Sequence, residues 1–311
     1  MKNQKKRAKS NKSSRNKTRQ NQWWYTIIGL LLVIFIIMWL SRTGYDASQR
    51  SNSEPKRGVE KTKTINKISK DKIYHNIGLP KIANREFYFE NEHGRYSFLY
   101  DTTLRQAVWV AHTLTAVEVS RKGVDRSNRF RSDPKVIERG FPSATDADYK
   151  KSGYDRGHLL PSADRDDTPE ENSATFLLSN ISPQRPNLNR KIWKSLEEYV
   201  RRVAEKYDSV WIVTGSKSDE IFNYIGKSRV GVPKYFYKTL LIKYSGKYYA
   251  IGFYIPNEDR FSGDFQSYAK TVDQLEEILS MDFYTGLDDS LQARAEGRYS
   301  TQIWFDKKLK K

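Results

Sequence analysis

The tetrapeptide Asp155-Arg156-Gly157-His158 is the stretch from which the fold and chemistry of this chain are best inferred. It places a carboxylate, a guanidinium, a residue without a side chain and an imidazole in consecutive positions, which suits a strand end that faces a phosphate. Arg156 could meet a phosphate with its planar fork of donors, and Gly157 lets a backbone or substrate approach closely. His158 could take a proton from water, because histidine ordinarily titrates near neutrality, while Asp155 could hold the local geometry. Taken alone, the string fits a surface turn with a charged pair equally well.

A second segment, about thirty residues downstream, strengthens the first reading. Apolar residues recur there at helical spacing: Ile192, Leu196, Tyr199, Val200 and Val203. This spacing predicts a helix over 189–206 that buries one stripe. Asn189 would lie in its first turn, where the partial positive charge of a helix N-terminus favours a phosphate, and an Asn carbonyl oxygen suits Mg²⁺. Glu197, about 80° around and about 12 Å along an α-helix, would reach the same ion through a bound water.

Several motifs in sequence order resemble the DNA/RNA non-specific endonuclease family, which includes the Serratia-type nuclease and mitochondrial endonuclease G. They are Asp155–His158, Phe176–Gln184, Asn187-Leu188-Asn189 and Trp193–Glu197, with weaker matches at Val213–Gly215, Val232–Lys238 and Thr271–Leu287. The resemblance covers roughly residues 85 to 306. It implies an α+β fold with a ββα-metal nuclease core and a central antiparallel sheet.

The resemblance also implies a role for each site residue. His158 would be the general base, Asn189 the single direct protein ligand of Mg²⁺, with Mn²⁺ as a substitute, and Glu197 an outer-shell ligand. Arg156 and Arg201 match arginines near the scissile phosphate. For Arg201, an ordinary helix-surface ion pair with Glu197, four residues earlier, remains an equally open reading.

One further arginine of the family precedes the tetrapeptide. Alignment on Asp133-Pro134 puts Asn128 at that position, so either Arg126 or Arg129 must serve instead. Both stay open as substrate-binding residues, together with Arg201 and Asp155.

The implied reaction is metal-assisted hydrolysis of DNA and RNA to products with a 5′-phosphate. No residue in the motifs is expected to contact a base edge, so low selectivity for nucleotide sequence is expected. A catalytically silent, membrane-anchored nucleic-acid receptor is the alternative, but the presence of His158, Asn189 and Glu197 favours the enzyme. An enzyme of the same fold restricted to one substrate or to a partner's DNA is a third reading.

Composition fits a polyanionic substrate. The formal net charge is +18 and the sequence pI about 9.7, and a basic surface attracts nucleic acid. Half of that excess lies in residues 1–22, which hold nine Lys or Arg and no Asp or Glu. The absence of Cys excludes disulfides and a thiolate zinc site. Only four histidines occur, which argues against a multi-histidine metal site. Of these, His93 is expected in a surface turn, and His112 is expected to be a hydrogen-bonded structural residue.

The N-terminal region predicts a membrane anchor. Trp23–Leu40 is an apolar or aromatic run of eighteen residues, long enough for a transmembrane helix. A secretory signal peptide is the rival, but the run is long for one and no Ala-x-Ala-like site follows. The basic residues 1–22 would stay cytoplasmic, with residues 41–80 as a flexible tether. A single pass through a bacterial inner membrane would then leave the endonuclease domain, 81–306, periplasmic or extracellular.

The remaining periodicity predicts mixed strands and helices. The expected elements are one or two strands over 96–119, a strand ending near His158, a strand at 176–182, a strand at 209–214, an antiparallel pair at 234–244 and 247–255, and a helix at 269–280.

Overall fold

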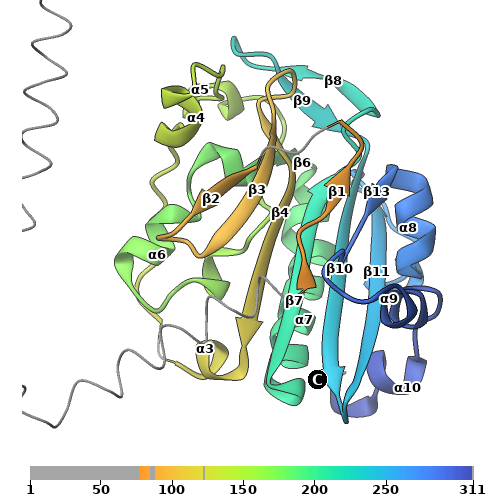
Figure 1. Cartoon of the computed structure of the whole chain (residues 1–311). Coiled ribbons are helices and arrows are strands. Elements are labelled where there is room, and N and C mark those ends of the chain that lie inside the picture. The colour runs from red at the N-terminus through yellow and green to blue at the C-terminus, as the bar shows by residue number, and fades with distance from the viewer. Residues whose placement is uncertain (1–76, 85–87, 122, 310–311) are drawn as a thin grey trace, which may run out of the picture. The chain divides into compact units, whose positions relative to one another are not determined.

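The computed structural model describes residues 77–84, 88–121 and 123–309, all of them within one compact unit, Thr62–Lys311 (Figure 1). The predicted tail, the predicted anchor at 23–40 and most of the predicted tether lie outside these residues. Within the described ranges, no helix combines the length and apolar character needed to cross a membrane.

A seven-stranded antiparallel sheet forms the centre, in the order β12-β11-β10-β7-β4-β3-β2. Its strands are β2 (Phe89–Asn91), β3 (Tyr96–Asp101), β4 (Gln106–Thr115), β7 (Ser209–Ser216), β10 (Tyr235–Tyr244), β11 (Lys247–Pro256) and β12 (Ala269–Lys270). The prediction of an α+β fold with a central antiparallel sheet is confirmed.

Three two-stranded ladders accompany the sheet: β1 (Lys81–Ile82) with β13 (Met281–Asp282), β5 (Asp155–His158) with β6 (Ile181–Gln184), and β8 (Ile221–Ile225) with β9 (Val230–Pro233). The α-helices are α3 (Ala116–Ser120), α4 (Pro134–Glu138), α5 (Asp146–Tyr149), α6 (Pro169–Ala174), α7 (Lys194–Tyr207), α8 (Val272–Leu279), α9 (Asp289–Glu296) and α10 (Thr301–Trp304). Short helical turns are η2 (Ser162–Asp164), η3 (Leu178–Asn180), η4 (Leu188–Trp193), η5 (Phe265–Tyr268) and η6 (Lys307–Leu309).

The sheet separates two apolar cores. Neighbouring residues of a strand point to opposite faces, so Leu240 joins the core that holds Leu196 of α7, whereas Leu241 joins the core that holds Leu275 of α8. Figure 1 accordingly shows α7 on one side of the sheet and α9 on the other. The two faces thus provide separate environments for chemistry.

Two predicted elements begin later than expected. The strand predicted at 176–182 starts only at Ile181, because the Asn180 side chain bonds both Leu160 backbone groups and holds η3 in a turn. The helix predicted at 269–280 starts after β12, where Thr271 and Gln274 form a reciprocal cap. Side-chain caps override the apolar periodicity at both places.

Candidate active site

The β5–β6 ladder carries the tetrapeptide, with Gly157 opposite Ser182 and His158 opposite Ile181. A Cβ at Gly157 would lie 2.2 Å from Gln184 Oε1, so any larger residue would displace the Gln184 side chain. The group that closely approaches Gly157 is therefore the Gln184 side chain of the protein itself.

His158 lies in an aromatic enclosure at the end of β5. Its side chain packs against Phe130 and Phe176, with ring centroids 5.7 and 5.0 Å away, and the residue is only 7% exposed. Its Nε2 makes no hydrogen bond within the described residues. Burial, assisted by the charge of Arg126, lowers the pKa of His158 to about 3. The imidazole is therefore uncharged at neutral pH, as a proton acceptor must be.

Asn189 lies in η4, a π-helical segment that continues directly into α7. The predicted helix is thus present, but its first turns are wider than α-helical turns. Asn189 Nδ2 donates to Asp155 Oδ2 at 2.9 Å, and no hydrogen bond to the side-chain carbonyl oxygen is seen among the described residues. Asp155, on the strand β5, therefore holds the Asn189 amide in one orientation.

Asp155 is the residue that fixes this orientation. Its two oxygens accept from Arg190 at 2.8 and 2.6 Å in addition to accepting from Asn189. Burial raises the pKa of Asp155, but these hydrogen bonds outweigh burial, so the pKa lies below its ordinary value. Asp155 was predicted both to hold the local geometry and to bind substrate, and the structure shows its oxygens engaged with Asn189 and Arg190.

Glu197, half-buried on α7, belongs to a group of enclosed charges. Burial raises the pKa of Glu197 above its ordinary value, and the charge of Lys238 offsets only part of that rise. Lys238 is 1% exposed, donates from Nζ to Thr214 Oγ1 at 2.5 Å, and has no salt bridge among the described residues. A buried cation without a paired carboxylate favours a negative charge on Glu197 nearby.

Arg201 binds Asp164 rather than Glu197, with Nη1 and Oδ1 2.9 Å apart. Asp164 is buried and also lies 3.7 Å from His112 Nε2. The helix-surface ion pair considered for Arg201 is therefore wrong, because a buried carboxylate from η2 takes its place. His112 lies in a strand, β4, as predicted, and is buried there, but the predicted hydrogen bond is missing: neither ring nitrogen makes one within the described part of the chain.

The structure distinguishes the two arginines left open by the sequence. Arg126 stacks over Phe176 at 4.9 Å and donates to Ser162, and its charge acts on both His158 and Glu197. Arg129 is exposed, and no contact joins its side chain to the site residues in the described segments. Arg156 contacts Asp146, with 2.7 Å between Nη2 and Oδ1, so it reaches a phosphate only by leaving or sharing that partner.

A divalent cation fits the donor set at this site. Asn189 offers a hard, oriented carbonyl oxygen, and Glu197 offers a carboxylate on the same helix. No group of three or more His, Asp or Glu side chains converges here among the described residues, so an ion would keep most of its water.

Four partner residues were not predicted from the sequence: Asp146, Ser162, Asp164 and Arg190. Each binds a predicted residue of another part of the fold: Asp146 binds Arg156, Ser162 binds Arg126, Asp164 binds Arg201 and Arg190 binds Asp155. Only Arg190 had a sequence signal, its position beside Asn189. The other pairings depend on contacts across the fold.

Comparison with known proteins assigns the chain to a family. The family model described as DNA/RNA non-specific endonuclease matches residues 86–290. A nuclease of Nostoc sp. is 32% identical over 216 residues, covering 66% of this chain and 76% of the relative. Mitochondrial endonuclease G of Homo sapiens is 35% identical over 179 residues, covering 54% and 57%.

A solved structure agrees with these sequence matches. The crystal structure of an EndoG/EndoGI complex superposes with a TM-score of 0.59 and 27% identity, covering 66% of this chain and 88% of the other. The predicted family is confirmed: this chain belongs to the DNA/RNA non-specific endonucleases and is a phosphodiester-hydrolysing enzyme.

Proposed function

We propose that the protein is a Mg²⁺-dependent endonuclease that hydrolyses DNA and RNA to 5′-phosphate products, with His158 as general base. The observation that carries the proposal is the buried imidazole of His158, whose Nε2 makes no hydrogen bond within the described residues and whose ring packs on Phe176, the same ring over which Arg126 lies. A nitrogen kept free of protein partners can take a proton from an attacking water.

The other residues position the substrate and the ion. Asn189 and Glu197 would hold a divalent cation, which supplies Lewis-acid stabilisation of the charge on the phosphate and leaving oxygen when bound. Asp155 accepts from Asn189 Nδ2, which leaves the carbonyl oxygen as the end of that amide available to an ion. Arg126, anchored on Phe176, is the guanidinium best placed to neutralise a phosphate oxygen beside His158.

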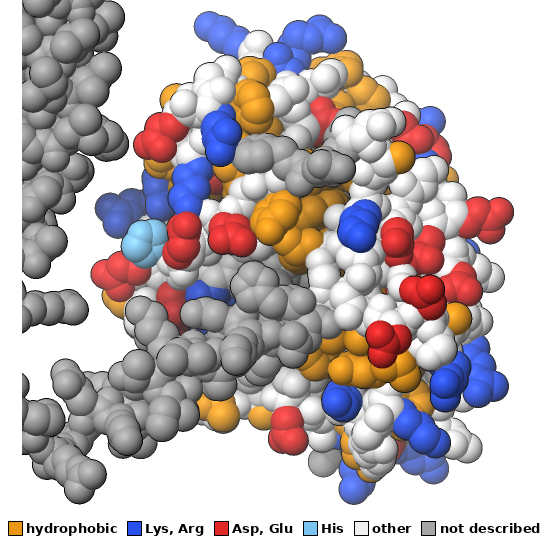
Figure 2. Space-filling view, viewed as in Figure 1, with side chains coloured by type: hydrophobic (Ala, Val, Ile, Leu, Met, Phe, Trp, Pro, Cys, Tyr) orange, Lys and Arg blue, Asp and Glu red, His pale blue; other side chains and the backbone are white. Residues whose placement is uncertain are grey.

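Low base selectivity follows from the same residues. The side chains proposed to act would contact water, the cation and the phosphate. Phosphate contacts carry no information about base sequence. Lys and Arg side chains at the upper edge of the face in Figure 2, over the β8–β9 hairpin, suit a polyanion of either sugar type.

Digestion of plasmid DNA and of RNA by the full-length protein tests the metal assignment. Activity is expected with Mg²⁺ or Mn²⁺ and not in EDTA. Asn189→Ala should abolish it, Glu197→Gln should reduce it less, and Glu198→Gln, a neighbouring helix residue paired with Lys194, should leave it unchanged. Full cleavage in chelator would refute the metal dependence.

We also propose that Trp23–Leu40 anchors the protein in a bacterial inner membrane with the enzyme domain outside the cytoplasm. The basic flank, residues 1–22, and the length of the apolar run support this orientation. Protease added to spheroplasts should digest the enzyme domain. Protection of that domain, under conditions in which a periplasmic marker is cut, would show the orientation to be wrong.

A further inference from the structure

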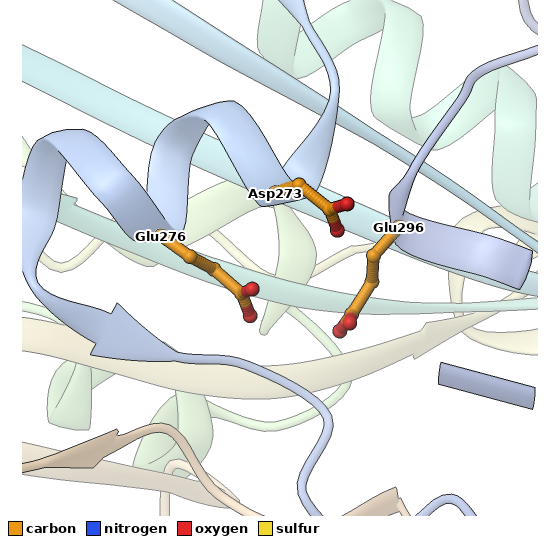
Figure 3. Close-up of side chains that lie close together, drawn as sticks. All are labelled: Asp273, Glu276 and Glu296. Atoms are coloured by element: carbon orange, nitrogen blue, oxygen red, sulfur yellow. The ribbon is translucent and has the colours of Figure 1, made fainter. Parts of the chain in front are cut away.

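Three carboxylates converge at a place remote in the fold from the proposed active site. Asp273 and Glu276 come from α8, and Glu296 is the last residue of α9. One oxygen of each lies within 4.8 Å of the others, and Figure 3 shows the three side chains directed toward a common space. These helices pack on the sheet face opposite α7.

Glu296 is a buried acid with an oxygen that lacks a partner. The residue is 3% exposed, and its Oε1 accepts no hydrogen bond from any described residue. No Lys or Arg forms a salt bridge with Asp273, Glu276 or Glu296 within the described ranges. Leaving a buried carboxylate oxygen unsatisfied is costly, so native structures usually supply a partner.

The surroundings of Glu296 supply further negative charge instead of a cation. The two charged side chains whose oxygens come within 4.8 Å of Glu296 are Asp273 and Glu276, and both are acids. Tyr284 is also buried, and its hydroxyl makes no hydrogen bond in the described part of the protein. This pattern indicates a missing positive partner rather than a set of solvated surface acids.

We propose that Asp273, Glu276 and Glu296 bind a divalent cation of the calcium class that joins α8 to the C-terminal end of α9. The donor set consists only of hard oxygens, which calcium prefers. Two ligands on opposite sides of calcium, each about 2.4 Å away, would be about 4.8 Å apart. Because 4.8 Å is also the upper limit on the three observed separations, the three oxygens lie close enough together to share one ion.

The remaining ligands can come from solvent. Asp273 is exposed, so water can reach the ion from its side, whereas Glu296 encloses the other side. One Glu276 oxygen already accepts from the Phe283 amide at 2.8 Å, leaving the second oxygen for the ion. Binding would thereby also brace the segment after β13. This site would stabilise the fold and take no part in phosphodiester cleavage.

Calcium binding by full-length Asn189→Ala protein tests the proposal, because that change removes the proposed direct catalytic ligand. Calorimetric titration should show one site, and calcium at one hundred times its Kd should raise the Tm by about 5 to 10 °C. Asp273→Asn and Glu296→Gln, each made in that background, should lose both effects. Glu277→Gln, an exposed acid on the same helix, is the matched control and should keep them.

The outcomes separate this site from any other. If Glu296→Gln does not fold, the exposed Asp273 still provides the test. Absence of calcium binding in the Asn189→Ala protein, or binding that survives both Asp273→Asn and Glu296→Gln, would overturn the proposal. Neither result depends on nuclease activity.

Discussion

Asp155→Ala should weaken Mg²⁺ binding by the enzyme without removing its proton acceptor. The carboxylate accepts from Asn189 Nδ2 at 2.9 Å and so fixes the orientation of that amide. Without it, the amide can turn, and its carbonyl oxygen is no longer held toward the ion. His158 and its aromatic enclosure should stay in place, because His158, Phe130 and Phe176 pack against one another.

The size of the effect can be reasoned in two ways. A hydrogen bond to a charged group contributes about 1.5–3 kcal/mol. Loss of a residue that orients a metal ligand typically lowers metal affinity by about 10- to 100-fold, or about 1.4–2.8 kcal/mol. The two ranges agree, so the Mg²⁺ concentration for half-maximal activity of Asp155→Ala should rise by about 10- to 100-fold.

Initial rates of plasmid cleavage over a Mg²⁺ titration provide the measurement. The rate of Asp155→Ala at saturating Mg²⁺ should approach that of the unmodified protein. Arg190→Ala is the matched control: it removes the exposed partner of Asp155, keeps the bond to Asn189, and should shift the titration little, since exposed ion pairs contribute about 0–1 kcal/mol. An unchanged half-maximal concentration in Asp155→Ala, or a rate that Mg²⁺ does not restore, would refute the reasoning.

Three further predictions concern buried groups. His158→Ala should lower cleavage by about 10²- to 10⁴-fold at every Mg²⁺ concentration while nucleic-acid binding persists; near-normal digestion by folded variant would contradict this. Asp164→Asn should lower the free energy of unfolding by about 3–5 kcal/mol in denaturant melts, since Arg201 loses its buried partner at 2.9 Å; a change below about 1 kcal/mol would count against it. Burial lowers the pKa of His112 to about 4, so the unfolded chain takes up its proton first, and stability falls as pH drops from about 6.5 to 4. His112→Asn should lessen that fall by roughly 3 kcal/mol, and identical acid melts would exclude the assignment.

Periodicity predicted the main elements because burial alone determines them. The hairpin around Gly246 and the strand before Gly215 both appear, since their apolar residues fill one or both cores. The start of β6 could not be predicted in this way, because the Asn180 amide bonds to Leu160, twenty residues away. Side-chain hydrogen bonds of this kind leave no periodic signal.

The hydrogen-bond and ion-pair partners of the site residues could not be predicted from the sequence for a related reason. Arg156 pairs with Asp146 of α5 and Arg201 with Asp164 of η2, and both pairings depend on how separate elements are placed. For Arg201, helical spacing indicated Glu197 as the ion-pair partner, and that partner was wrong. A buried carboxylate is the stronger partner because less water screens the attraction.

The geometry of the proposed metal helix differs from the predicted one in a way that helps the chemistry. Eight residues of regular α-helix make about 2.2 turns, which would leave Asn189 and Glu197 about 80° apart. The segment Leu188–Trp193 is π-helical, and its i to i+5 bonding takes more residues for each turn. An average of about four residues per turn would complete two turns between Asn189 and Glu197 and bring both onto one face. The sequence holds no simple signal for that widening, yet it turns an eight-residue spacing, poorly suited to an α-helix, into one that places both residues on one face of the proposed metal helix.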